Sequence, residues 1–373
     1  MEALIGVLGI LQLTVAIFLL IPIYYWIDTT VMRTRVVSDK DGKYSDLKVS
    51  IILPMRNEEK NVIRKLSTII PELLSYENFE LIVADSGSED GTGELARNFL
   101  QSSELEFGKW RVEEFSIPGK NIAINGVIGK IDSDVVIISD ADANVSPGWL
   151  DVVLQRLSEG DVGVVSGLEK VSKTSDFNSY YRTRSNRLRI SESLIDSTPV
   201  LEGSLLAWKT SALGEFRISE EVNADDAQIG LEAINRGYRS IVDPRISFSD
   251  FETKDRTIGE SIRRSQGLSI VLSKNIRLGL KCPRKDARRA MFHAFFLYVI
   301  FPWSVLIFAI NSVAAFMISP GVGDSWGFYS IFVITIVLIT HQGRSLAIGV
   351  AISIIAHTQA ILGKRYNRWD PVR

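Results

Sequence analysis

Two carboxylates spaced two residues apart follow an apolar run near the middle of the chain. Val135–Ile138 are four β-branched residues, and Asp140 and Asp142 come after Ser139. Because a strand covered on both faces by helices does not alternate between apolar and polar residues, this run predicts a buried parallel strand. Ligands of open α/β sheets bind beyond the carboxyl ends of strands, where these carboxylates would offer hard oxygen ligands to a divalent cation. The alternative is a turn whose aspartates cap the following helix.

Strands and helices are expected to alternate around this run, between residues 48 and about 246. Val49–Leu53 and Glu80–Ala84 have the composition of strands, and a helix is expected to begin near residues 57–59 and to run toward Ser75,. Turn formers in residues 86–93 separate the second strand from the next expected helix,. This β-α-β-α order is typical of an α/β fold with a doubly wound, mostly parallel sheet.

The composition restricts the classes of function. The chain of 373 residues is long enough for two domains, and its formal net charge of −2 does not suggest a nucleic-acid-binding protein,. Basic character is local instead, because residues 253–289 contain eleven Lys and Arg against three Asp and Glu. The single cysteine, Cys282, excludes an internal disulfide, and three histidines with one cysteine argue against a zinc site of the usual composition,.

The first apolar segment, residues 3–26, contains no charged residue and is long enough to span a bilayer,. It lacks a basic start and a small-residue cleavage site, so we interpret it as a retained membrane anchor rather than a signal peptide,. By the positive-inside rule, the basic residues that follow it predict a cytoplasmic flank: Arg33, Arg35, Lys40 and Lys43,.

Further membrane-associated segments are expected after the central domain. Residues 257–280 form an amphipathic, basic pattern that is typical of a helix in the membrane interface,. Three apolar segments follow, Ala290–Ser319, Trp326–Thr340 and Ser345–Leu362, and the chain ends in a basic tail. A helix over Trp326–Thr340 would be about 22 Å long, which is short for a hydrocarbon core of roughly 30 Å. We therefore expect two crossings in this region, with one of the last two segments re-entrant or interfacial, and a cytoplasmic tail.

The central domain, roughly residues 48–267, resembles the family 2 glycosyltransferases with the GT-A fold, specifically their membrane-anchored branch. The resemblance is carried by short motifs, each weak alone, that occur in the family's order between apolar segments. Pro54-Met-Arg-Asn-Glu58 is similar to the family's first nucleotide-binding segment, and Asp85 is similar to its base-contacting aspartate. Gly119-Lys120 resembles the diphosphate-side motif, and Asp140-Ala-Asp142 resembles the D-x-D motif. Ala224–Gly230, together with Asn235–Tyr238, resembles the T-E-D segment.

The resemblance implies an inverting enzyme that transfers a sugar from a nucleotide-diphosphate sugar. Asp140 and Asp142 would hold Mg²⁺ or Mn²⁺ against the leaving diphosphate. Asp226 would be the base that deprotonates the acceptor hydroxyl, with Asp225 raising its pKa by charge repulsion. The nucleotide-sugar would be bound by Pro54, Arg56, Glu58, Asp85, Lys120, Asp140 and Arg263, and the acceptor side would be lined by Glu202, Gly203 and Ser204.

Several of these residues also have an ordinary structural interpretation. Asp85 could cap a turn, the acidic pair Asp225–Asp226 is favoured by the dipole at a helix start, and Lys120 could be a solvated surface residue. An expected helix over Tyr180–Ile195 carries four arginines, which most often form a solvated face and otherwise could contact phosphate: Arg182, Arg184, Arg187 and Arg189,.

Two departures from the family's motifs affect the expected product. Ser86 stands where a second aspartate is frequent, and the Q-x-x-R-W motif would fall on residues 260–264, where only Arg263 is retained. The missing glutamine and tryptophan favour a single transfer, to a lipid or lipid-linked acceptor, over a processive polysaccharide synthase. A non-catalytic membrane scaffold with the same fold is a third alternative, which the intact aspartates argue against. A nucleotidyltransferase is disfavoured because no glycine-rich basic loop follows the first strand.

The expected organisation is a multi-pass protein of the cell membrane with a cytoplasmic catalytic domain. Its expected partners are a nucleotide-diphosphate sugar, a lipid or lipid-linked acceptor and the membrane, and no nucleic acid. The expected segments are a transmembrane anchor (1–30), a GT-A catalytic domain (47–250), basic amphipathic interfacial helices (251–289), transmembrane or re-entrant segments (290–362) and a basic tail (363–373).

Overall fold

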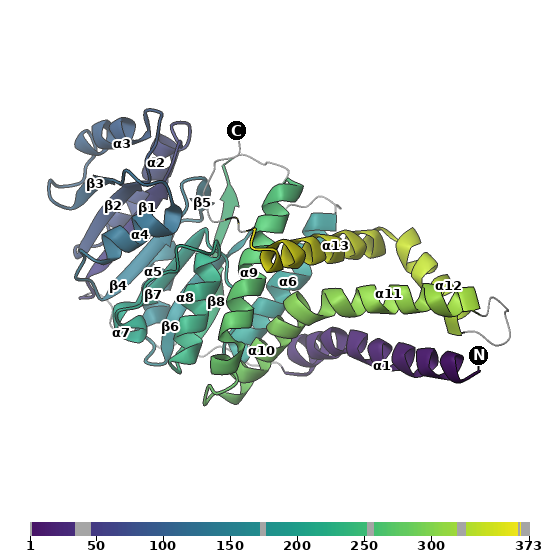
Figure 1. Cartoon of the computed structure of the whole chain (residues 1–373). Coiled ribbons are helices and arrows are strands. Elements are labelled where there is room, and N and C mark those ends of the chain that lie inside the picture. Colours follow the sequence, from purple (N-terminus) through teal and green to yellow (C-terminus); the bar gives the residue numbers. More distant parts are fainter. Residues whose placement is uncertain are drawn as a thin grey trace.

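A computed structural model of the chain describes residues 2–33, 46–171, 177–251, 257–318, 326–364 and 366. It consists of an α/β domain built on an eight-stranded sheet, and of long helices that extend from one side of this domain (Figure 1). These helices come from both ends of the chain and pack against one another, so the first and last parts of the sequence meet in one bundle.

The sheet has the strand order β3-β2-β1-β4-β7-β6-β8-β5. β1 is parallel to β2 and β4, β2 is parallel to β3, and β6 is parallel to β8. β7 runs antiparallel between β4 and β6, and β5 runs antiparallel to β8. The predicted doubly wound, mostly parallel α/β sheet is confirmed. The strands are β1 (Val49–Met55), β2 (Phe79–Asp85), β3 (Trp110–Glu114), β4 (Val135–Ser139), β5 (Ala143–Val145), β6 (Val162–Glu169), β7 (Leu205–Lys209) and β8 (Arg239–Asp250).

Helices cover both faces of the sheet. Ile51 and Leu53 of β1 pack with α2, α3 and α5 on one face, and Ile52 packs with α4, α7 and α8 on the other. Val135–Ile138 of β4 are 0% exposed because helices cover this strand on both sides, which explains its uninterrupted apolar run,. The helices of these layers are α2 (Val62–Leu73), α3 (Thr92–Gln101), α4 (Lys120–Ile128), α5 (Trp149–Ser158), α7 (Thr210–Leu213) and α8 (Asp225–Asn235).

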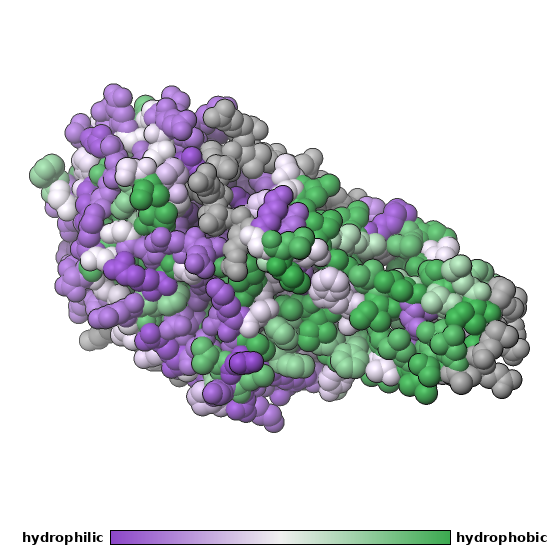
Figure 2. Space-filling view, viewed as in Figure 1, coloured by the Kyte–Doolittle hydropathy of each residue, from purple (hydrophilic) through white to green (hydrophobic). Residues whose placement is uncertain are grey.

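Apolar side chains dominate the surface of the long helices, whereas polar side chains dominate the surface of the α/β domain (Figure 2). Within the described residues, three segments are long and apolar enough to cross a membrane: Leu4–Met32, Lys285–Ile318 and His341–Ile361. The apolar α12 is shorter. The helices outside the α/β layers are α1 (Glu2–Ile27) with the π-helical η1 (Asp28–Met32), α9 (Ile258–Gly279), α10 (Lys285–Phe295), the π-helical η2 (Phe296–Ile300), α11 (Phe301–Ile318), α12 (Trp326–Ile339) and α13 (His341–Ile361).

A buried polar network fastens α1 to α11 and α12. Gln12 Nε2 donates to Ser312 Oγ (2.7 Å) and Ser330 Oγ (3.0 Å), and Asn311 Nδ2 donates to Gln12 Oε1 (2.5 Å). Hydrocarbon offers such groups no partner, so polar side chains in membrane helices bond to one another. The network therefore fixes how these helices pack.

Helix α6 (Phe177–Ile195) connects the α/β domain to α1. Tyr25 at the end of α1 donates its hydroxyl to Glu192 of α6 (2.9 Å), and two arginines of α6 lie over the ring of Trp26. The other two arginines of the predicted solvated face are partly buried in ion pairs, Arg182 with Glu169 and Arg189 with Glu202. The expectation of a solvated face therefore holds for Arg184 and Arg187, which are exposed, and is wrong for Arg182 and Arg189.

The first helix of the α/β domain begins later than predicted. Asn57, at φ 54°, has a left-handed backbone conformation, which a helix start does not accommodate,. Its N–H donates to Ser88 Oγ (3.0 Å), and its side-chain oxygen accepts from the N–H of Glu89 (2.8 Å). Residues 57–59 therefore belong to a loop, and α2 begins at Val62.

Candidate active site

The Asp140–Asp142 turn lies at the carboxyl end of β4, next to the end of β1. The N–H of Asp140 donates to the carbonyl of Ser204 (3.2 Å), which also accepts from Ser139 Oγ (2.9 Å). The N–H of Ala143 donates back to the carbonyl of Asp140 (3.3 Å) and closes the turn. The turn thus lies beyond the end of a buried parallel strand, as the sequence predicts, and Ser204 supports it through its backbone.

Lys120 joins this turn to the acidic pair at the start of α8. Lys120 is the first residue of α4, and its Nζ lies 2.8 Å from Asp140 Oδ1 and 2.9 Å from Asp225 Oδ2. Although burial favours the neutral amine, the two carboxylates raise the pKa of Lys120 well above its ordinary value. Lys120 is therefore a charged bridge between two motifs that are far apart in the sequence, not a solvated surface residue.

Asp226 lies next to this bridge in a site that favours its protonated form. Burial, followed by the charges of Asp225 and Glu202, raises the pKa of Asp226 to about 7, although Lys120 acts in the opposite direction. A methyl group added at Gly203 would lie 3.8 Å from Asp226 Cβ and 3.9 Å from Lys120 Nζ, so Gly203 lies alongside both. A carboxylate with a pKa near 7 is suited to accept a proton at neutral pH.

Two asparagines of α4 hold the segment that leads to the acidic pair. Asn125 donates to the carbonyl of Ile218 (2.8 Å) and accepts from its N–H (3.0 Å). Asn121 donates to the carbonyls of Ser219 (2.9 Å) and Val222 (3.1 Å). Both asparagines are buried, one helical turn apart. Neither asparagine was predicted from the sequence, although their spacing of four within a short apolar helix places them on one face.

The residues predicted to bind the nucleoside, Pro54, Arg56, Glu58 and Asp85, lie at the ends of β1 and β2 and in the loop that follows β1. Pro54 is buried near the end of β1, Arg56 is partly buried, and the N–H of Glu58 donates to Thr92 Oγ1 (2.8 Å), which ties the first loop to the second. Asp85 is buried at the end of β2, and its Oδ1 accepts from the N–H of a residue three positions later (2.9 Å). One oxygen of Asp85 therefore caps a turn.

Ser86, which departs from the family's motif, has a structural role of its own. Its Oγ accepts from the N–H of Gly119 at 2.7 Å. Gly119 directly precedes Lys120, so this bond fixes the start of α4 relative to the end of β2. Ser86, whose side chain is shorter than that of aspartate, thus helps to position Lys120.

Glu202, predicted on the acceptor side, is surrounded by arginines. Burial disfavours its charge, but Arg189, Arg182 and Arg264 outweigh this effect and lower the pKa of Glu202. Arg264 is exposed on α9, and the predicted diphosphate contact Arg263 is a partly buried residue of the same helix. Arg264, at a position where the sequence motif calls for tryptophan, thus acts on Glu202 through its charge.

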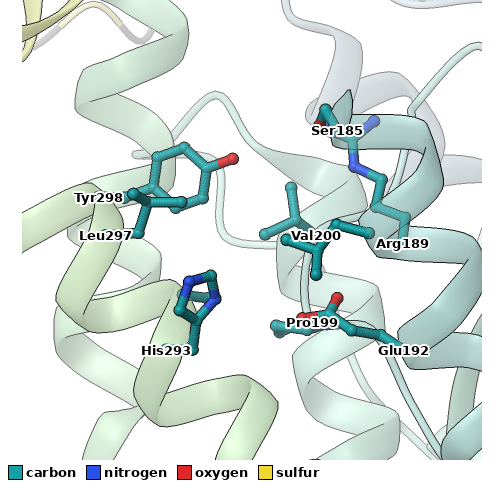
Figure 3. Close-up of a pocket in the computed structure, with 10 residues that line it drawn as sticks. Ser185, Arg189, Glu192, Pro199, Val200, His293, Leu297 and Tyr298 are labelled. Atoms are coloured by element: carbon teal, nitrogen blue, oxygen red, sulfur yellow. The ribbon is translucent and has the colours of Figure 1, made fainter. Parts of the chain in front are cut away.

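A small pocket adjoins this acceptor side (Figure 3). It lies between α6, which contributes Arg189 and Glu192, and the α10–η2 region, which contributes His293 and Tyr298. Arg189 belongs both to the pocket and to the ion pair with Glu202. The pocket therefore lies between the predicted acceptor side and the base of the long apolar helices.

Helix α9 and the residues that follow α13 pack against the loop that precedes the acidic pair. A methyl group at Gly267 would lie 1.9 Å from the carbonyl oxygen of Asn223, so the backbone of α9 packs directly on the loop before α8. Gln266 is buried, donates to the carbonyl of Lys364 (2.9 Å) and accepts from the N–H of Tyr366 (3.2 Å). Asn223 donates to the carbonyl of Tyr366 (2.7 Å), which completes the contact.

The two carboxylates of the D-x-D turn fit a divalent cation that is shared with a substrate. Among the described residues, no group of three or more His, Cys, Asp or Glu side chains is arranged to hold a metal ion. Reduced solvation, with the charges of Asp140 and Asp250, raises the pKa of Asp142 to about 6, so negative charge is concentrated here. Mg²⁺ is commonly bound through one or two carboxylates and completed by substrate phosphates. Asp140 and Asp142 match that arrangement.

Comparisons with known proteins agree with this architecture. Residues 50–216 match the model of Glycosyl transferase family 2. The glycosyltransferase AglE of Haloferax volcanii is 29% identical over 120 residues, which are 32% of this chain and 38% of AglE. The dolichol-phosphate mannosyltransferase of Pyrococcus furiosus is 24% identical over 230 residues, which are 58% of this chain and 62% of that protein. Both alignments span less than two thirds of the relative's length.

A solved structure shares the fold over nearly the whole chain. The mannosyltransferase PcManGT from Pyrobaculum calidifontis, solved in complex with GDP-Man and Mn²⁺, superposes with a TM-score of 0.79 and 24% sequence identity. The superposition covers 96% of this chain and 100% of that one. At this level of identity the likeness establishes a common fold.

Proposed function

We propose that this chain, whose residues 50–216 form a family 2 glycosyl transferase domain, is a membrane-bound inverting glycosyltransferase. It moves a hexosyl group from a nucleoside-diphosphate sugar to a hydroxyl of a lipid or lipid-linked acceptor. The transfer takes place at the cytoplasmic face of the membrane.

One observation carries this proposal. A single charged lysine, Lys120, lies within 2.9 Å of both a D-x-D carboxylate and the acidic pair that contains the base. Sugar transfer requires a positive charge next to the leaving diphosphate and a base next to the acceptor hydroxyl, separated by the anomeric carbon. The residues around Lys120 provide both within one site.

The division of labour among the residues follows from their charges. Asp140 and Asp142 would hold Mg²⁺ or Mn²⁺, which supplies electrostatic stabilisation of the developing diphosphate charge. Lys120 binds phosphate oxygens, and Asp85 with residues 54–58 holds the nucleoside. Asp226 takes the proton of the acceptor hydroxyl, which attacks the anomeric carbon from the face opposite the diphosphate and inverts its configuration.

The position of the membrane helices supports a lipid acceptor. The pocket in Figure 3 lies between α6 and the α10–η2 region and shares Arg189 with the acceptor-side ion pair. An acceptor held in the bilayer could therefore approach Asp226 from this side. In the proposed arrangement, residues 1–30 anchor the chain, residues 47–250 form the cytoplasmic catalytic domain, and residues 251–289 lie along the interface. Residues 290–362 cross or re-enter the membrane, and the tail 363–373 is cytoplasmic.

A donor screen tests the proposal. Purified full-length protein in detergent is incubated with Mn²⁺ and each of a panel of GDP- and UDP-sugars, with and without a membrane lipid extract as acceptor, and free GDP or UDP is measured. GDP-mannose belongs in the panel because PcManGT was solved with it. Lipid-dependent release of nucleoside diphosphate with one donor, lost in Asp226→Asn, is expected. Release that does not depend on lipid would contradict the acceptor assignment.

The main alternative is a processive polysaccharide synthase of the same family. The retained Arg263 and the surrounding membrane helices are compatible with it, whereas Glu260 and Arg264 occupy the positions of the motif's glutamine and tryptophan. The product distinguishes the two: one added sugar supports the proposed transferase, and a ladder of lengths supports the synthase. A non-catalytic scaffold would release no nucleotide with any donor.

A further inference from the structure

A fully buried lysine lies directly behind the D-x-D turn. Lys65 is on the apolar face of α2, three residues after Val62 and four before Ile69, and its side chain is 0% exposed. Burying an ammonium group is costly even when it is hydrogen-bonded, and a methionine of similar shape would pack there without that cost. A buried amino group on an otherwise apolar helix face is unfavourable for stability, and such positions are commonly functional.

The ammonium group of Lys65 binds both ends of the turn. Its Nζ donates to Ser139 Oγ and to the carbonyl of Ala143, each at 2.7 Å. Ser139 directly precedes Asp140, and Ala143 directly follows Asp142, so one side-chain amino group bonds to both ends of the D-x-D segment. The two backbone bonds that Asp140 makes within this region are longer, at 3.2 and 3.3 Å. The contacts of Lys65 are thus shorter than these two backbone bonds.

Electrostatics supports the same arrangement. Burial lowers the pKa of Lys65 to about 7, while the charges of Asp140 and Asp142 oppose this effect. Both aspartates are therefore close enough to act on the ammonium group through space, although neither is bonded to it.

We infer that Lys65 is a positioning residue, which sets the separation and direction of the Asp140 and Asp142 carboxylates for a divalent cation. The inference rests on the proposed function, because it concerns the cation site of the transferase. Loss of a hydrogen-bonded group that supports metal ligands typically weakens metal binding by about 10–100-fold. We expect a loss of that size in Lys65→Met, since methionine keeps the length and volume of the side chain but has no donor.

Binding of Mn²⁺ in the presence of GDP, and separately of UDP, tests this role without sugar transfer. Free Mn²⁺ is measured by electron paramagnetic resonance with purified full-length protein. Lys65→Met should raise the Kd for Mn²⁺ about 10–100-fold, while kcat at saturating Mn²⁺ stays within a few-fold of wild type. Lys60→Met is the matched control, because Lys60 is exposed shortly before the same helix and loses the same charge. It should leave the Kd unchanged.

A second variant protects the test against misfolding. Ser139→Ala removes one of the two acceptors of Lys65, and it should weaken Mn²⁺ binding by a smaller factor. Unchanged Mn²⁺ affinity in a folded Lys65→Met or Ser139→Ala protein would overturn the inference and leave the proposed function intact. Wild-type protein that binds no Mn²⁺ with either nucleotide would overturn the cation site itself, and with it the metal-dependent transferase.

Discussion

The pH dependence of sugar transfer should follow the ionisation of Asp226. Burial and the charge of Asp225 raise the pKa of Asp226 to about 7, and a general base acts only when it is ionised,. About one tenth of the molecules would then carry an ionised Asp226 at pH 6, and about nine tenths at pH 8. We expect kcat/KM to fall about tenfold for each pH unit below pH 6 and to be flat above pH 8.

The same pKa makes a prediction about stability. Asp226 has a pKa of about 7 in the folded protein, against an ordinary value of 3.8 in the unfolded protein. It therefore binds a proton more tightly when the protein is folded. The contribution of Asp226 to the free energy of unfolding therefore falls as the pH rises from about 4 to about 7. Above that range the full destabilisation is present. The difference corresponds to about 4 kcal/mol, which is the largest gain that Asp226→Asn can give at pH 8. Near pH 4 the gain should vanish.

Two assays on matched variants test this reasoning. Asp226→Asn should abolish transfer, leave nucleotide affinity nearly unchanged, and raise the thermal midpoint at pH 8 more than at pH 4. Asp225→Asn removes the charge next to Asp226, so any residual activity should begin to fall on the acid side at a lower pH than in wild type. Transfer that persists in Asp226→Asn would refute the base assignment. If Asp226→Asn instead loses nucleotide binding and Asp225→Asn loses turnover, the two roles are reversed.

Three further predictions follow from other contacts. Asp142→Asn should lower turnover by orders of magnitude in a folded protein, because it removes a charged cation ligand, and wild-type turnover that survives excess EDTA would contradict the metal site. Gln266→Ala should lower the free energy of unfolding by about 0.5–1.5 kcal/mol, read by thermal melting, because the buried Gln266 loses its bonds to the backbone of Lys364 and Tyr366,; an unchanged midpoint would show that this contact is not formed. A cysteine introduced at Arg373 should resist an impermeant thiol reagent in intact cells and react with it after the cells are permeabilised, with a cysteine on a confirmed external loop as the positive control, since the basic tail is expected inside.

The sequence predicted the parts of the site that follow from local pattern. Val135–Ile138 identified a central strand because a strand buried on both faces needs no polar residue, and Asp140 and Asp142 are placed by the end of that strand. The late start of α2 was missed because it depends on the left-handed backbone of Asn57, which bonds to a loop about 30 residues away. A local sequence pattern does not indicate a contact between residues this far apart in the chain.

The residues that hold the site together were mostly beyond prediction. Lys65 bonds to a turn more than 70 residues later, and Asn125 bonds to a loop more than 90 residues later. Each of these side chains satisfies backbone or hydroxyl groups that only the folded chain brings near. Lys65 stands on an otherwise apolar helix face, and this pattern indicates that it is buried. The pattern does not identify the residues to which Lys65 bonds.

The bridge made by Lys120 has a consequence for the order in which ligands bind. Because its ammonium group lies 2.8 Å from Asp140, a divalent cation that arrives alone must compete with an internal cation for that carboxylate. A diphosphate that arrives together with the cation offers Lys120 a new anionic partner and releases Asp140. Each ligand then raises the affinity for the other by the same factor. In the proposed transferase, this site would therefore bind the metal ion and the nucleotide together more tightly than either one alone.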